Sequence, residues 1–413
     1  MNVWINSSFD NLPQEGYRAQ RYWLMSEAFA RAGHRVVYWT GDFSHAGKAK
    51  RKFIRPLDND TAVIKLIPTP AYRTNVSLMR VWSHRVYAER WKKLAVAAVD
   101  SRELPPPDLI VVSMPTLSSA AAALELGERF GARTVVDMMD AWPDTFHRLV
   151  PKPIRFLAPL FFGPLHRKAR SIYRNADLVS GVCRSYAKMI AGFGVENFHL
   201  AYHGIDMSGA VPRRSRPDGG VLKLVYAGNL GRTYDLETVL KAVASDRNTT
   251  LDIAGAGPLE PKWKQLASEL DLAERVRFHG YLDAESLADL FSRCELGVIP
   301  MSADSFVGLP YKLCDYVKAG LGVVSSLEGE CNSFVTEHGV GVEYIPGDVD
   351  SFLKALDRWR ELSKGGSSGD YSAMLVKLDS NEIYSRYAAA LQDGLFDRAD
   401  AENREQARKP PGK

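Results

Sequence analysis

The segment Leu222-Lys223-Leu224-Val225-Tyr226-Ala227-Gly228-Asn229-Leu230-Gly231-Arg232 decides the fold of this chain. Its first six residues are mostly apolar and predict a buried strand, and the following five form a loop that contains two glycines. From Leu236 the chain has helical periodicity, with Asp235 placed to cap the first turn. A strand, a short loop and a helix form one unit of a parallel α/β sheet.

The same alternation continues through the rest of the second half of the chain. The further predicted strands are 250–254, 276–279, 296–299 and 322–326, and the predicted helices are 259–273, 284–293 and 310–319. The first half repeats the pattern with longer insertions, and its predicted strands are 3–6, 36–40, 109–113, 134–138 and 178–182. Strands that alternate with helices predict two α/β domains, each with a doubly wound parallel sheet.

Chain length supports the same division. A chain of 413 residues is too long for one ordinary core and fits two domains of about 200 residues. Residues 212–220, PRRSRPDGG, combine proline, glycine and charge without apolar periodicity, so we expect the linker there. The predicted domains are therefore 1–211 and 221–393, with a last helix that can return to the first domain. Residues 394–413 are predicted to form a disordered tail.

Composition excludes several classes of protein. A hydrophobic content of 46% with 25% charged residues is typical of globular domains, and a net charge of +4 is too small to indicate a nucleic-acid binder. The four cysteines lie far apart without a C-x-x-C pair, so neither a zinc site nor a disulfide framework is expected. We find no secretory leader and no apolar run of the ~20 residues that a bilayer requires, so we expect a cytoplasmic protein.

Residues 308–319 give the clearest indication of a binding site. Gly308 precedes a predicted helix opened by Pro310, so the free N–H groups of the first turn face a loop where a backbone can approach an anion. Lys312 lies in that turn, where the helix dipole disfavours a cation unless an anion is nearby. Asp315 follows on about the same face and can accept hydrogen bonds from hydroxyl groups. An ordinary surface pair between Lys312 and Asp315 explains the same spacing, and the sequence does not decide between the two.

The segment 308–324, GLPYKLCDYVKAGLGVV, resembles the G-x-P-x-K-x-x-E-Y…A-G-x-P-V-V signature of family 4 glycosyltransferases of the group 1 type. Segments that resemble other parts of the same domain are 226–232, 251–258, 276–281 and 294–300. The resemblance implies the GT-B fold, in which two Rossmann-like domains face each other across a cleft. It also implies that the second domain binds a nucleotide-sugar donor and the first receives the acceptor.

The resemblance carries roles onto particular residues. Arg232 and Lys312 neutralise the donor diphosphate, and Asp315 holds the ribose hydroxyls in the place where glutamate is commoner. Val307 replaces a glutamate that many members carry, so the contact to the donor sugar stays open. The expected donor-binding residues are Gly16, Gly228, Gly231, Arg232, Tyr281, Gly308, Leu309, Lys312 and Asp315, and the expected catalytic residues are Asp140, Arg232 and Lys312.

In the first half, residues 135–143, VVDMMDAWP, resemble a strand end that often reads H-D-x-W-P in the family. Met139 replaces the histidine, and Asp140 becomes the candidate that orients the reacting hydroxyl or sugar. A carboxylate that caps a turn is the open alternative for Asp140. His34 is interpreted as structural, and residues 202–206 as a hinge near the domain junction.

A basic and apolar segment follows. No acidic residue lies between Asp144 and Asp177, while arginines and lysines in 148–174 bracket the apolar run 156–162. This combination is typical of a peripheral membrane contact with anionic lipid. A core helix beneath a solvated face is the open alternative, and three prolines argue against one continuous helix.

The expected function is transfer of a sugar from a nucleotide-diphosphate donor to an acceptor hydroxyl, with retention of configuration, in cell-surface polysaccharide or glycolipid synthesis. The donor is a substrate, and neither a metal nor another cofactor is expected. The expected partners are the donor, a glycan or lipid-linked acceptor, and the inner face of the membrane through 148–174. A GT-B nucleotide-sugar epimerase and a non-catalytic GT-B subunit remain the alternatives.

Overall fold

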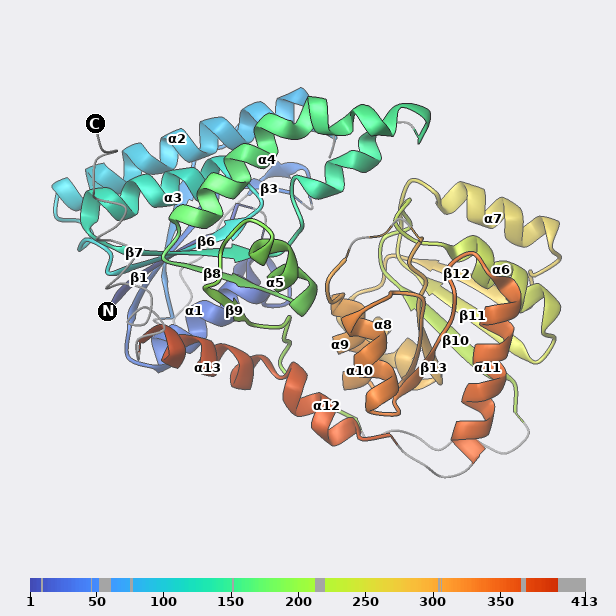
Figure 1. The fold of residues 1–413 in the computed structure, drawn as a ribbon. Helices are drawn as coiled ribbons and strands as arrows, with labels where there is room; N and C mark the ends of the chain where they lie inside the picture. Colours follow the sequence, from blue (N-terminus) through green and yellow to red (C-terminus); the bar gives the residue numbers. More distant parts are fainter. Residues whose placement is uncertain are drawn as a thin grey trace. The chain divides into compact units, whose positions relative to one another are not determined.

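The computed structural model describes residues 1–8, 10–45, 47–51, 61–74, 77–150, 152–211, 220–303, 305, 307–364 and 369–392. The chain packs into two compact units (Figure 1). The first contains Met1–Tyr202 together with the helix that begins at Ser380, and the second contains His203–Asp379. Each unit is a parallel α/β sheet of the doubly wound type that the sequence predicts.

In the described part of the first unit, seven parallel strands lie in the order β5-β2-β1-β6-β7-β8-β9. These strands are β1 Asn2–Asn6, β2 Arg35–Gly41, β5 Val63–Ile67, β6 Leu109–Met114, β7 Arg133–Met138, β8 Leu178–Gly181 and β9 Phe198–Leu200. A short antiparallel pair, β3 Phe43–Ser44 and β4 Ala49–Lys50, follows β2. The helices are η1 Pro13–Glu15, α1 Arg21–Arg31, α2 Leu78–Asp100, α3 Leu117–Phe130, η2 Asp144–Leu149, η3 Lys152–Leu157, α4 Ala158–Asn175, α5 Arg184–Ala191 and α13 Ser380–Gln392.

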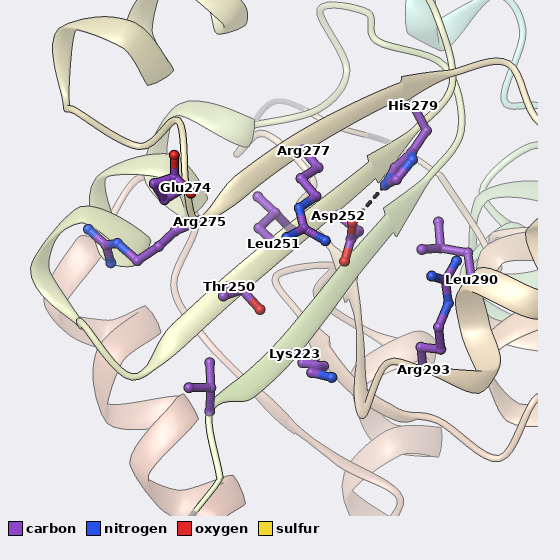
Figure 2. Close-up of a pocket in the computed structure, with 11 residues that line it drawn as sticks. Lys223, Thr250, Leu251, Asp252, Glu274, Arg275, Arg277, His279, Leu290 and Arg293 are labelled. Carbon is purple, nitrogen blue, oxygen red and sulfur yellow. Dashed lines mark hydrogen bonds and ion pairs between the residues drawn. The ribbon is translucent and has the colours of Figure 1, made fainter.

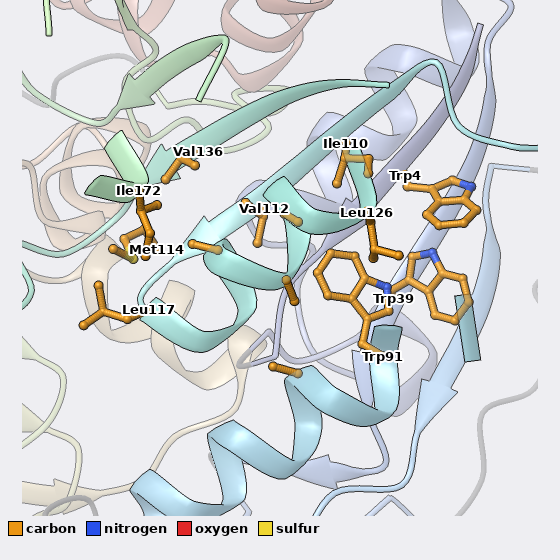
Figure 3. Packing of buried hydrophobic residues seen from close by; sticks show 14 of the residues in the cluster. Trp4, Trp39, Trp91, Ile110, Val112, Met114, Leu117, Leu126, Val136 and Ile172 are labelled. Carbon is orange, nitrogen blue, oxygen red and sulfur yellow. The ribbon is translucent and has the colours of Figure 1, made fainter. Parts of the chain in front are cut away.

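Alternation along the strands divides the core of this unit into two layers. On one face, Trp4 of β1 packs edge-to-face on Trp39 of β2 with ring centroids 5.3 Å apart, and Trp91 of α2 joins the same cluster (Figure 3). On the other face, Val3 and Ile5 pack with residues of α1 and α13. Successive side chains of β1 therefore point to opposite faces, each covered by helices, as in a buried parallel sheet.

In the described part of the second unit, six parallel strands lie in the order β12-β11-β10-β13-β14-β15. The strands are β10 Leu222–Ala227, β11 Thr249–Ala254, β12 Val276–Gly280, β13 Leu296–Ile299, β14 Gly322–Ser325 and β15 Gly341–Glu343. The helices are α6 Leu236–Ser245, α7 Glu260–Glu269, α8 Ala284–Ser292, α9 Tyr311–Lys318, α10 Glu330–Glu337, α11 Val349–Lys364 and α12 Tyr371–Leu378. The strand order reverses between β10 and β13, which makes the carboxyl ends of these two strands the switch point where such sheets bind ligands.

The strands that the sequence predicts are confirmed in both units, with ends that shift by one or two residues. Three strands of the parallel sheets were missed, namely β5, β9 and β15, because each is at a sheet edge and is short or partly polar. The expectation that prolines break the helix after residue 157 is wrong, since α4 runs continuously through Pro164. The carbonyl that Pro164 cannot bond belongs to the exposed Leu160, where water can satisfy it.

The segment after Tyr202 packs on the second unit. The amide of Ile205 donates to the carbonyl of Leu378 at 3.1 Å, and the amide of Val211 donates to the carbonyl of Lys318 at 2.9 Å. These bonds place the crossing of the chain at residues 202–203. The linker proposed at 212–220 and the tail proposed at 394–413 stay predictions, because residues 212–219 and 393–413 lie outside the described part of the chain.

A buried ion pair joins α1 to β7 inside the first unit. Arg21 donates through Nε to Asp137 Oδ2 at 2.7 Å and through a second nitrogen to Oδ1 at 2.8 Å, and both side chains are fully buried. Tyr22 and Ser180 donate their hydroxyls to the same carboxylate at 2.8 and 2.6 Å. Burial acts to raise the pKa of Asp137, but Arg21 and the hydroxyls outweigh it and hold that pKa below its usual value.

The same network fastens the chain where it leaves and re-enters the first unit. A further nitrogen of Arg21 donates to the carbonyls of Ala201 and Tyr202 at 2.8 and 2.9 Å. The hydroxyl of Ser180 lies 2.9 Å from that of Tyr387 on α13. Arg21 therefore orders the last residues of β9's exit, while Ser180 ties the returning helix to β8.

We expect Arg21→Met to lower the free energy of unfolding by about 3–5 kcal/mol, because it leaves a buried carboxylate without its cation. Adding Asp137→Asn to that variant should recover part of the loss, since the unpaired charge is removed. The measurement is an equilibrium urea titration. Arg31→Met, on the same helix but exposed beside Glu27, is the control and should cost less than about 1 kcal/mol. A loss at Arg21 no larger than at Arg31 would contradict the assignment.

Candidate functional site

The predicted donor-binding residues of the second unit gather at its switch point, where the loops after β10 and β13 are tied together. The carbonyl of Thr233 accepts from the amide of Ser302 at 3.0 Å and from the hydroxyl of Ser305 at 2.8 Å. The amide of Asp235 donates to the carbonyl of Pro300 at 2.7 Å, and its carboxylate caps α6 as the sequence predicts. The two loops therefore hold one shared conformation at the carboxyl ends of the strands.

Glycines allow these loops to approach each other closely. Gly228 and Gly255 have φ values of 144° and 135°, which side chains rarely adopt. A Cβ on Gly255 would overlap the carbonyl of Gly228, and a Cβ on Gly257 would overlap the carbonyl of Leu230. The amide of Leu230 in turn donates to the carbonyl of Ala256 at 3.0 Å. The loops after β10 and β11 thus form a backbone surface with no side chain between them.

Lys312 reaches this surface from the first turn of α9. Its Nζ lies 4.1 Å from the ring centroid of Tyr234 and 5.0 Å from that of Tyr226. A Cβ on Gly228 would overlap this ammonium, so the glycine leaves the space that Lys312 occupies. Among the described residues no carboxylate pairs with Lys312, so the surface pair with Asp315 that the spacing allowed is not formed. Aromatic faces stabilise the cation without neutralising its charge.

The position of α9 is set by Tyr316. Its hydroxyl accepts from the amide of Ala227 at 3.0 Å and donates to the carbonyl of Val298 at 3.3 Å, which bridges β10 and β13 beyond their last paired residues. Gly297 leaves room for the ring, since a Cβ there would overlap it. Pro310 is the N-cap of α9 and not its first residue, and no side chain caps this end. The first amides of α9 are therefore held beside Gly228 and are available to an anion.

The other predicted residues of this unit are placed around the same loops. Arg232 is exposed on the loop after β10, next to Gly231. Leu309 is buried and Gly308 half-buried ahead of α9, while Asp315 is half-buried one turn along it. The ring of Tyr281 is 81% exposed and touches neither Lys312 nor Arg232 through any recorded contact. Its neighbour Gly280 accepts from the amide of Gly255 at 2.6 Å, which puts Tyr281 on the adjoining loop.

Gly16 and Asp140 belong to the first unit. Gly16 ends the short helix η1 with a φ of 83° and has no neighbour that a Cβ would meet, so its backbone conformation alone accounts for glycine. Asp140 follows β7 with an exposed side chain. The surrounding protein raises the pKa of Asp140, and Arg80 opposes the rise. His34 bonds the N-terminal amine through Nδ1 at 3.3 Å and packs on Phe29, which fits its structural interpretation.

A polar and aromatic cluster that the sequence did not single out lies beside Asp140. The guanidinium of Arg80 lies 5.2 Å from the ring centroid of Trp142 and 5.8 Å from that of Tyr72. Arg80 Nε donates to His84 Nε2 at 3.3 Å, and the hydroxyl of Tyr72 lies 2.5 Å from His45 Nδ1. Burial, with neighbouring cations, lowers the pKa of His84 to about 3 and that of His45 to about 4. Both imidazoles are therefore neutral at pH 7.

We expect the stability of the protein to fall below pH 6.5 because of His84. Its pKa of about 3 in the folded state lies below the ordinary value of ~6.5, so the unfolded chain binds more protons between these limits. The contribution is complete above pH 6.5, and about 2 kcal/mol of it is lost at pH 5. His84→Gln removes the titration and should show a smaller drop in thermal midpoint between pH 7.5 and pH 5 than the wild type. Equal drops would contradict the assignment.

A separate cavity of about 330 Å³ lies on the sheet of the second unit (Figure 2). It is lined from β10, β11, β12 and the end of α8, and its polar centre is the pair between His279 Nε2 and Asp252 Oδ1 at 2.6 Å. None of the predicted donor-binding residues lines it. The cavity therefore does not coincide with the loops that carry Lys312.

Family models match both units. Residues 210–368 match the glycosyl transferases group 1, and residues 19–203 match the glycosyl transferase 4-like domain. An uncharacterized glycosyltransferase of Methanocaldococcus jannaschii is 24% identical over 170 residues, which cover 40% of this chain and 41% of that relative. The chain is thus aligned to less than half the length of that curated relative.

Solved structures with a similar fold include two glycosyltransferase-type proteins of cyanobacteria. HepE of Anabaena, in complex with UDP, has a TM-score of 0.66 and 15% identity, with 95% of this chain and 99% of that chain covered. Sucrose-phosphate synthase of Thermosynechococcus elongatus has a TM-score of 0.64 and 15% identity, with 99% and 100% covered. At this identity the likeness shows the fold, which is GT-B.

Within the described part of the chain, no helix combines the length and the apolar character needed to cross a membrane.

Proposed function

This chain belongs to the group 1 glycosyltransferases of family 4 and has the GT-B fold, and on that premise we propose that it transfers a sugar from a nucleotide-diphosphate donor to an acceptor hydroxyl. The observation that carries the proposal is the ammonium of Lys312. It lies over two tyrosine rings, beside a glycine surface and uncapped helix amides, and no carboxylate of the described residues neutralises it.

A diphosphate would meet complementary charge at this place. Backbone amides at a helix N-terminus and a lysine without a counter-ion stabilise the negative charge that builds up on a leaving diphosphate. We assign Arg232, on the exposed loop after β10, to the same task, and Asp315 to the ribose hydroxyls. Gly228, Gly231 and Gly308 supply close backbone approach. The UDP bound by HepE supports a nucleoside diphosphate as the ligand, and the base stays open.

The proposed reaction retains the configuration of the sugar. The acceptor oxygen forms its bond to the anomeric carbon as the bond from that carbon to the leaving phosphate oxygen breaks, and the acceptor proton passes to the leaving phosphate. Asp140 orients the acceptor hydroxyl in the first unit. Because Arg232, Lys312 and the amides of α9 supply the positive charge, we propose that no metal is needed.

The biological setting is also part of the proposal. We propose synthesis of a cell-surface polysaccharide or glycolipid in the cytoplasm at the inner face of the membrane, with a peripheral contact through 148–174. The support is α4 and the turn before it, where Phe156 and Leu160 are each 76% exposed and Phe161 is 62% exposed, among basic residues. Exposed apolar side chains within a basic segment suit an anionic bilayer surface.

We expect Lys312→Ala to lower kcat/KM by about 10²–10³, because it removes a charge aimed at the leaving group. The thermal midpoint should stay near that of the wild type, since Lys312 is in no ion pair. The assay follows nucleoside diphosphate release in the presence of EDTA, after a thermal-shift screen of UDP-, GDP- and ADP-sugars has identified the donor. Lys264→Ala, an exposed lysine paired with Glu260 on α7, is the matched control.

Three outcomes would contradict the proposal in different ways. Unchanged kcat/KM in Lys312→Ala would remove the role of Lys312. Isomerisation of the donor without an acceptor would favour a GT-B epimerase. Donor binding without transfer to any acceptor, together with the valine at position 307, would favour a non-catalytic subunit.

A further inference from the structure

The cations beside Asp140 keep their charge. Arg80 donates to His84, and Lys48 Nζ lies 3.2 Å from His45 Nδ1. Both imidazoles are neutral, so each orients its cation through a lone pair and cancels none of its charge. The carboxylate that acts on Arg80 is Asp140, and the charge that acts on Lys48 is that of Arg80. Two cations face one carboxylate in this cluster, which leaves an excess of positive charge.

Apolar side chains border the cluster. The first turns of α2 present Leu78, Met79, Val81 and Trp82 to solvent, with Leu78 89% and Trp82 52% exposed. Arg80, between them in sequence, is half-buried against Trp142 and Tyr72. An arginine that turns inward between outward apolar residues places a cation at the foot of an apolar surface.

The exposed apolar residues of η3 and α4 continue this surface. Trp142 packs on Phe146 with ring centroids 4.7 Å apart, and Phe146 packs on Phe162 of α4 at 5.7 Å. These contacts connect the first turns of α2 to those of α4, which lie side by side along the same layer of helices (Figure 1). Exposed apolar patches of this kind mark binding surfaces more often than chance exposure.

We propose that this cluster binds the acceptor, and that the acceptor is an amphiphile with a phosphate headgroup. The phosphate lies on Arg80 and Lys48, the apolar chain lies along Leu78, Trp82 and Phe156, and the reacting hydroxyl lies beside Asp140. The arrangement of charge and apolar surface carries this inference, and it rests on the proposed transfer reaction. A guanidinium that is held by an imidazole and two rings is preorganised for a phosphate.

The test measures binding by isothermal titration calorimetry with three probes. Dodecyl phosphate has headgroup and chain and is used below its micelle concentration, dodecyl maltoside has the chain without the anion, and inorganic phosphate has the anion without the chain. We expect the wild type to bind dodecyl phosphate at least tenfold more tightly than either of the others. Similar affinity for dodecyl maltoside would mean apolar docking alone, and similar affinity for inorganic phosphate would mean an anion site alone. Either result would overturn the proposal.

Variants assign the parts of the site. Arg80→Ala should weaken dodecyl phosphate binding tenfold or more, while Arg85→Ala, exposed on the same helix, should leave it unchanged. Lys48→Gln should weaken it too and serves if Arg80→Ala does not fold. Trp82→Ser should weaken dodecyl phosphate binding without changing that of inorganic phosphate. Unchanged binding in both Arg80→Ala and Lys48→Gln would overturn the assignment.

The two proposals fail separately. If the protein binds dodecyl phosphate as expected but no nucleotide-sugar, the transfer function fails and the lipid site stands. If it binds a nucleotide-sugar and transfers to a neutral acceptor while ignoring dodecyl phosphate, the function stands and this inference fails.

Discussion

The absence of a side chain at residue 228 is the constraint on which the donor site depends. The ammonium of Lys312 occupies the space that a Cβ of residue 228 would fill, and Gly228 also has a φ of 144° that other residues rarely adopt. The loop after β10 can thus lie under the lysine with its amide groups exposed to a ligand. Lys312 is then held over the rings of Tyr226 and Tyr234, where it is oriented and still charged.

The rest of the second unit keeps these two elements together. Tyr316 bridges β10 and β13 through its hydroxyl, so the helix that carries Lys312 is tied to the strand that leads to Gly228. Gly255 and Gly257 let the neighbouring loop support the first from behind. In the first unit a different interaction has the corresponding task, since Arg21 and Asp137 fix α1, β7 and the departing chain in one buried network. Each unit therefore has its own rigid core beneath a polar edge.

The sequence was sufficient for the fold and for part of the site. Periodicity located β13, which is confirmed at Leu296–Ile299, and the order of strands and helices predicted two doubly wound sheets. Edge strands such as β9 escaped because three residues carry too little pattern. Lys312 stood out because a cation in a first helical turn needs an explanation. Its partners Tyr226 and Tyr234 could not be inferred, because only the fold brings those rings to α9.

The cluster around Arg80 shows the same limit more strongly. Tyr72, Arg80 and Trp142 come from three separate segments, and none of them belongs to a motif with a fixed spacing. The exposed apolar residues at the start of α2 also look like ordinary helix residues in the sequence, because exposure depends on which face the fold covers. Motifs thus located the donor side, whereas the proposed acceptor side required the structure.

The most direct test of the central claim is a crystal structure with the nucleoside diphosphate that binds most tightly. We predict that the diphosphate lies within hydrogen-bond distance of Lys312 Nζ and of backbone amides in the loop from Gly228 to Arg232. A diphosphate bound elsewhere, for example in the cavity lined by His279 and Arg277, with Lys312 still over its two rings, would contradict the account.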